Sequence, residues 1–94
     1  MTIKVLLVDD HAVVRSGLSK FLIVNKDLKL VGEASDGAEA VQLTSLHKPD
    51  IVLMDLMMPG TDGIIATREI RQKYPSVKVI ALTSFAEQNM IRGA

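Results

Sequence analysis

Apolar residues fall partly into short continuous runs along the chain. The runs at Ile3–Val8, 51–54 and 77–82 are rich in β-branched residues and lack a polar–apolar alternation. This pattern predicts strands that are buried on both faces. Leu28–Ala34 is less apolar, because it holds two charged residues and a glycine, and is predicted to be a strand nearer an edge of the sheet.

Helical periodicity fills the segments between these runs. Over residues 11–24, four apolar side chains recur on one helical face: Val14, Leu18, Phe21 and Leu22. A second helix is predicted over residues 36–47, where Asp36 is a suitable N-cap and Glu39 follows at the spacing of a capping box. Pro49 then ends that helix.

Two more helices are predicted, one from about residue 61 to Tyr74, where Pro75 stops it, and one over 86–94. Strands and helices therefore alternate, which predicts an α/β fold with a parallel sheet and right-handed crossovers. A chain of 94 residues is expected to form one domain.

Composition excludes several classes. The 11 basic residues balance the 11 acidic ones, so nucleic-acid binding by this segment is not supported. The absence of cysteine excludes disulfides and thiolate metal sites, and fits a reducing compartment, here expected to be the cytoplasm. No apolar run approaches the roughly 18 residues of a membrane span, so no membrane association is expected.

The predicted chemistry lies where the strands end. In open α/β sheets, ligands bind beyond the carboxyl ends of the strands. Asp9 and Asp10 follow the first strand, Asp55 follows the third and Thr83 follows the fourth. One interpretation is that these carboxylates converge on a single site. The other is that each one caps a helix or is solvated, in which case Asp10 caps the helix that follows it.

A converging set of carboxylates suits Mg²⁺, which prefers hard oxygen ligands. A carboxylate can also act as a nucleophile toward phosphorus, and the Thr83 hydroxyl is placed to donate a hydrogen bond to a phosphoryl oxygen. The loop at 56–63 is longer than a minimal turn and contains a proline and two glycines. Such a loop can aim a backbone carbonyl at the metal.

These residues resemble the receiver domain of bacterial two-component response regulators. The motifs are VLLVDDH at 5–11, SDGAEAV at 35–41, PDIVLMDLMMPGTDG at 49–63 and VIALTS at 79–84. The segment DDHAVVRSGL resembles the NarL/FixJ subgroup, whose members carry a C-terminal DNA-binding domain. The resemblance implies a flavodoxin-like (CheY-like), doubly wound parallel sheet, with strand order 2-1-3-4 for the strands present here.

The resemblance also implies roles for particular residues. Asp55 matches the phospho-acceptor, and Thr83 matches the hydroxyl residue that senses the phosphoryl group. Asp9 and Asp10 match the acidic pair that organises Mg²⁺, together with Asp55 and the backbone carbonyl of Met57. The implied partners are a sensor histidine kinase, a second receiver in a phosphorylation-dependent homodimer, and DNA through a C-terminal domain that is absent here.

The chain departs from the family pattern at its end. Family members continue to a fifth strand and a fifth helix, and the Lys that follows that strand has no counterpart here. We therefore expect residues 1–94 to be a C-terminally truncated receiver domain, marginally stable or associating through its uncovered face. We also expect weak Mg²⁺ binding and poor phosphorylation and switching.

Two other classes compete with this interpretation. A haloacid-dehalogenase-like, Mg²⁺-dependent phosphatase places two acids two residues apart, whereas Asp9 and Asp10 are adjacent. A flavodoxin-like flavin carrier needs a phosphate loop rich in glycine and hydroxyl groups after the first strand. His11 is expected to be a solvated first-turn side chain, His47 a helix-end residue, and Arg15 part of a solvated helix face, with neither histidine binding a metal.

Overall fold

The computed structural model describes residues 2–56 and 62–82. In chain order the elements are β1 (Ile3–Val8), α1 (Ala12–Val24), β2 (Leu28–Ala34), α2 (Gly37–His47), β3 (Ile51–Asp55), α3 (Asp62–Lys73) and β4 (Lys78–Leu82). The four predicted strands are confirmed to within one residue at each end, and three predicted helices are confirmed with small shifts. The helix predicted over 86–94 lies outside the described residues.

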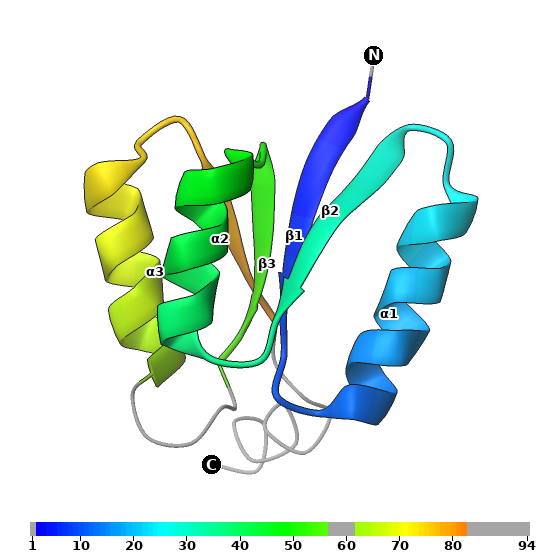
Figure 1. The fold of residues 1–94 in the computed structure, drawn as a ribbon, viewed down its shortest axis with the longest axis horizontal. Helices are drawn as coiled ribbons and strands as arrows, with labels where there is room; N and C mark the ends of the chain where they lie inside the picture. Colours follow the sequence, from blue (N-terminus) through cyan, green and yellow to red (C-terminus); the bar gives the residue numbers. More distant parts are fainter. Residues whose placement is uncertain (1, 57–61, 83–94) are drawn as a thin grey trace, which may run out of the picture.

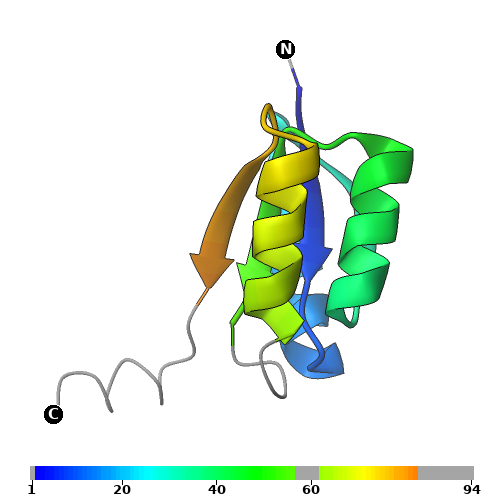
Figure 2. The same cartoon turned by 90° about the vertical axis from the view of Figure 1, so that its left-hand side faces the viewer.

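The four strands form one parallel sheet in the order β2-β1-β3-β4, which confirms the expected order. The strand arrows in Figure 2 accordingly point the same way. Val8 pairs with Ala34 on one side and with Met54 on the other. This register places the residue after β1 beside the last residue of β3. The strand order also confirms that β2 is an edge strand.

Helices cover both faces of the sheet, with α2 and α3 on one face and α1 on the other (Figure 1). The main core lies between the sheet and the α2–α3 layer. Its fully buried side chains come from alternate positions of the strands and from one face of each helix: Leu6, Val8, Val52, Met54, Ala40 and Ile70. Burying such side chains stabilises the fold by about 1.5–3 kcal/mol for each large one.

The face that carries α1 is less covered. Of the apolar side chains that recur on one face of this helix, Leu22 is buried, whereas Val14 is 49% and Phe21 65% exposed. This exposure agrees with the expected incomplete cover of that face, since α1 contacts mainly β2 and β1. Ile80 on β4 alternates with the core residue Val79 and is 41% exposed. Among the described residues, burial is thus weaker on the α1 face.

The ends of α2 are made by local contacts. The Asp36 carboxylate accepts a hydrogen bond from the Glu39 backbone N–H at 2.7 Å, which confirms Asp36 as the N-cap. The Glu39 carboxylate in turn accepts from the backbone N–H of Ser35 at 2.7 Å, one residue before the cap. At the other end, Lys48 adopts a left-handed conformation with φ of 47°. This conformation turns the chain toward Pro49.

A contact between helix starts ties α2 to α3. The Asp62 carboxylate, in the first turn of α3, accepts a hydrogen bond from the backbone N–H of Gly37. A Cβ atom on Gly37 would lie 2.5 Å from Asp62 Oδ1 and 2.8 Å from the Asp62 carbonyl oxygen. Position 37 therefore has no room for a side chain while this contact is kept.

We expect Gly37→Ala to lower the free energy of unfolding by about 1–3 kcal/mol, because the added methyl group overlaps Asp62. Gly17→Ala is the matched control, since a Cβ there meets no heavy atom within 4 Å. In the interior of α1 that change should instead raise stability by about 0.5–1 kcal/mol. Urea denaturation followed by circular dichroism measures both. Equal effects of the two substitutions would contradict the steric account.

Candidate functional site

Asp9 leaves the end of β1 in a tightly held conformation. Its backbone N–H donates to the Ala34 carbonyl at 3.0 Å, so the sheet pairing continues through it. Its carboxylate accepts from the backbone N–H of His11 at 2.7 Å, and its carbonyl accepts from Arg15 Nη1 at 2.8 Å. With only 3% of its surface exposed, Asp9 presents a buried charge at the edge of the sheet.

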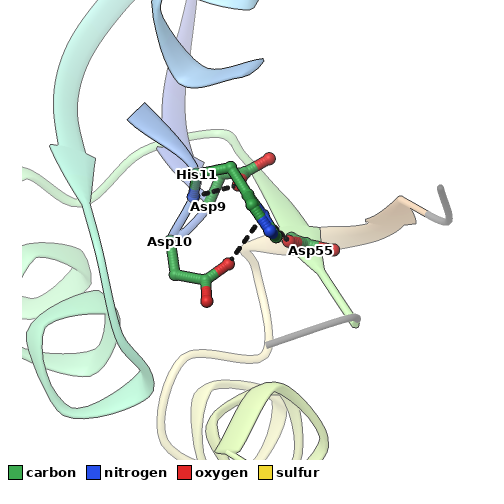
Figure 3. Close-up of side chains that lie close together, drawn as sticks. All are labelled: Asp9, Asp10, His11 and Asp55. Atoms are coloured by element: carbon green, nitrogen blue, oxygen red, sulfur yellow. Dashed lines mark hydrogen bonds and ion pairs between the residues drawn. The ribbon is translucent and has the colours of Figure 1, made fainter. Parts of the chain in front are cut away.

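Asp55 ends β3 next to Asp9 and is also buried, with 5% of its surface exposed. Asp10 lies on the solvent side, and 27% of its side chain is exposed. One oxygen of each carboxylate and a ring nitrogen of His11 all lie within 4.8 Å of one another (Figure 3). The structure therefore brings together the three acidic residues that the order of elements predicted at this edge.

The capping role considered for Asp10 was wrong. The N-cap of α1 is His11, in an extended conformation, and its side chain makes no capping hydrogen bond. The carboxylate of Asp9 instead holds the N–H of His11. The carboxylate of Asp10 instead contacts the ring of His11.

The His11 ring belongs to the acidic cluster, which the sequence analysis missed. Its Nδ1 atom lies 2.9 Å from Asp10 Oδ1, 3.4 Å from Asp9 Oδ1 and 3.9 Å from Asp55 Oδ2. The side chain is still 61% exposed, so the expected solvation is only part of its environment. The available signal was its place directly after the acidic pair, where the chain turns into α1.

Arg15 is the second residue that the sequence analysis missed. It was expected on a solvated helix face, but its guanidinium donates to the Asp9 carbonyl and forms an ion pair with Glu33 of β2 at 3.4 Å. Arg15 lies one helical turn after His11, and its N–H donates to the His11 carbonyl at 2.9 Å. That spacing was the signal that could have placed it over the acidic pair.

Met57 and Thr83 lie outside the described residues, as does most of the loop after β3. The described chain reaches the positions just before them. Leu56 donates its N–H to the Leu82 carbonyl at 3.2 Å, so β3 and β4 remain side by side up to these two residues. The predicted roles of Met57 and Thr83 stay predictions.

The donor set fits a hard divalent cation. Carboxylate oxygens are the ligands that Mg²⁺ prefers, and two of the three belong to buried residues whose mutual repulsion a cation would relieve. The partly exposed Asp10 leaves one side of the cluster accessible to solvent. A carboxylate in such a position can also attack an electrophile that arrives from that side.

Comparison with known proteins assigns the family. The family model for the response regulator receiver domain matches residues 5–94. The chain belongs to this receiver family. It is 47% identical over 91 residues to the response regulator protein VraR of Staphylococcus aureus, which covers 97% of this chain and 44% of VraR. The chain thus spans less than half the length of this curated relative.

Solved structures agree with the assignment. The response regulator domain of Thermotoga maritima CheB matches with a TM-score of 0.84 and 40% identity over 94% of this chain and 65% of that one. The receiver domain of the putative regulator NarL of Mycobacterium tuberculosis matches with a TM-score of 0.80 and 33% identity, over 99% and 79%. This receiver domain is therefore a signalling domain of a two-component system with NarL-like relatives.

These matches do not support the two competing interpretations of the sequence. Neither the haloacid-dehalogenase-like phosphatase nor the flavin carrier is supported by the family model or by the relatives named above. Across residues 2–56 and 62–82, no helix combines the length and apolar character needed to cross a membrane.

We expect Arg15→Ala to lower the free energy of unfolding by about 1 kcal/mol, because it removes the hydrogen bond to the Asp9 carbonyl and the pairing with Glu33. Lys20→Ala, at an exposed position of the same helix, should change stability by less than about 0.5 kcal/mol. Urea titration of both variants is the measurement. If Arg15→Ala is as stable as Lys20→Ala, Arg15 does not hold Asp9 in place.

Proposed function

We propose that this receiver domain accepts a phosphoryl group on Asp55 from a sensor histidine kinase. The observation that carries the proposal is the position of Asp55 at the end of β3, where its carboxylate meets those of Asp9 and Asp10. A buried carboxylate in a cluster open to solvent on one side suits attack on an incoming phosphorus atom. The receiver-family match supports the same role.

We propose Mg²⁺ as the cofactor, held by Asp9, Asp10 and Asp55, with the Met57 carbonyl as a further ligand. Three carboxylates within reach of one another match the oxygen chemistry of this ion. When bound, the ion neutralises negative charge on the carboxylates and on the phosphoryl oxygens.

The residues of the chain have separate parts in the transfer. A carboxylate oxygen of Asp55 forms a bond to phosphorus while the phosphorus–nitrogen bond of the donor phosphohistidine breaks, and the electron pair leaves with the histidine nitrogen. Such in-line transfer depends mainly on positioning and charge stabilisation. Arg15 supports the positioning, because it holds the carbonyl of Asp9 and so the turn that carries both acids.

Phosphorylation is proposed to shift a conformational equilibrium, with the Thr83 hydroxyl turning toward the phosphoryl group. The output is proposed to be homodimerisation and regulation of transcription through a DNA-binding domain. Two relatives support the DNA-binding part of this output: one solved match is a LuxR-family two-component response regulator from Aurantimonas, and another is a complex of the response regulator RcsB with DNA. A kinase and DNA as partners imply a cytoplasmic location.

We expect Asp55→Asn to abolish labelling by acetyl phosphate, because the amide cannot form the acyl phosphate. Asp50→Asn is the matched control: Asp50 precedes β3, at the opposite end of the strand, and accepts a hydrogen bond from the Lys4 N–H that an amide oxygen can still accept. Intact mass spectrometry measures the added phosphoryl group. Undiminished labelling of Asp55→Asn would refute the proposed acceptor.

Mg²⁺ should raise the free energy of unfolding of the wild-type chain, by about 2.7 kcal/mol when its concentration is 100 times the dissociation constant. Asp10→Asn should reduce this gain, because it removes one of the carboxylates around the proposed site. Thermal unfolding with MgCl₂ and with EDTA gives both values. An equal gain in the two proteins would show that Asp10 takes no part in binding the ion.

A further inference from the structure

We propose that Glu33 of β2 is a positioning residue for phosphoryl transfer. It acts through Arg15, whose guanidinium fixes the peptide group that joins Asp9 to Asp10. The inference rests on the proposed function and adds to it a residue outside the acidic cluster. Three observations carry it: the place of the carbonyl that Arg15 holds, the two partners of the guanidinium, and the position of Arg15 in α1.

The carbonyl that Arg15 holds lies between the two adjacent acids. Arg15 Nη1 donates to the carbonyl of Asp9 at 2.8 Å. Because a peptide group is planar, fixing this carbonyl also fixes the direction in which the backbone enters Asp10. On its other side, the N–H of Asp9 donates to the Ala34 carbonyl at 3.0 Å. The relative orientation of the two carboxylates therefore depends on whether Arg15 stays in place.

The guanidinium of Arg15 connects β2 to the end of β1 through two different nitrogens. While Nη1 holds the Asp9 carbonyl, Nε lies 3.4 Å from Oε1 of Glu33. The side chains of Arg15 and Glu33 are 25% and 39% exposed, so their ion pair is partly shielded from solvent. An ammonium group is a single point charge with one nitrogen, so a lysine cannot occupy both positions.

A cation near the start of α1 needs an acidic partner. The backbone N–H of Arg15 donates to the carbonyl of His11, the N-cap, so Arg15 lies close to the positive end of the helix dipole. The first turn of α1 contains no acidic residue that would offset this repulsion. Among the described residues, the ion pair that Arg15 forms is with Glu33. Loss of that carboxylate should therefore release the guanidinium, and with it the Asp9 carbonyl.

The first test is the affinity of the whole chain for MgCl₂, measured by isothermal titration calorimetry. Arg15→Ala should weaken Mg²⁺ binding by about tenfold. Charge alone predicts the opposite sign, because the substitution removes a cation that repels Mg²⁺. Arg15→Lys keeps the charge and should still weaken binding, since one nitrogen cannot hold both partners.

Glu33→Gln should weaken Mg²⁺ binding by about two- to fivefold, which is the range for a partly exposed ion pair. Glu69→Gln is the matched control. Its carboxylate is 40% exposed and pairs with Lys73 at 3.1 Å, so the change removes the same charge from a similar ion pair on α3. That variant should leave the affinity for Mg²⁺ unchanged.

The double variant decides whether Glu33 acts through Arg15. In the Arg15→Ala chain, Glu33→Gln should have no further effect on Mg²⁺ affinity. An equal loss in both backgrounds would show that the carboxylate attracts the ion directly, and this result would overturn the proposal. Unchanged or tighter binding by Arg15→Ala or by Arg15→Lys would overturn it as well. Circular dichroism establishes that each variant is folded.

A second readout requires no metal. The backbone amide nitrogen of Asp10 belongs to the same peptide group as the Asp9 carbonyl, so its NMR resonance reports the hydrogen bond from Arg15. Without Mg²⁺, this resonance should shift in Glu33→Gln and stay in place in Glu69→Gln. An unmoved resonance in folded Glu33→Gln would show that Glu33 does not act on this peptide group.

These outcomes separate the positioning role from the proposed function. If the wild-type chain binds Mg²⁺ and Arg15→Ala binds it equally well, the positioning role fails and the Mg²⁺ site stands. If the wild-type chain binds no Mg²⁺, both fail. Neither result bears on the phospho-acceptor role, which fails only if Asp55→Asn is still labelled.

Discussion

The gathering of negative charge at one edge of the sheet is the constraint around which this domain is organised. Asp9 and Asp55 are both almost fully buried, and Asp10 lies beside them. Unit charges at such separations repel by about 3–4 kcal/mol at an effective dielectric constant of about 20. The described contacts offset part of this repulsion, since the backbone N–H and the ring of His11 face the carboxylates. A divalent ion would offset the rest.

The sheet register creates the cluster, and the first turn of α1 modifies it. Parallel pairing of β1 with β3 makes the residues at their carboxyl ends neighbours, although 46 positions separate Asp9 from Asp55 in the chain. His11 and Arg15 then approach from the start of α1 and hold the side chain and the carbonyl of Asp9. The hydrogen bonds of His11 and Arg15 to Asp9 therefore connect the start of α1 directly to the acidic cluster.

The two faces of the sheet differ in how firmly they are packed. On one face, α2 and α3 enclose the main core, and the contact between Gly37 and Asp62 joins the starts of these helices. On the other face, α1 buries little more than Leu22, and several of its apolar side chains are exposed. The well-buried layer of α2 and α3 thus supports β1 and β3, while the helix that contacts the site is the less buried one.

The sequence by itself determined the elements, because each depends on neighbouring residues: apolar runs specify the strands, and Asp36 with Glu39 specifies the start of α2. It also predicted that three acids would converge, since parallel strands end at one edge. Only the tertiary structure decided the contacts of His11 with Asp55, of Arg15 with Glu33 and of Gly37 with Asp62. Their partners Asp55, Glu33 and Asp62 are distant in the chain, and no local pattern encodes a contact between segments that only folding brings together.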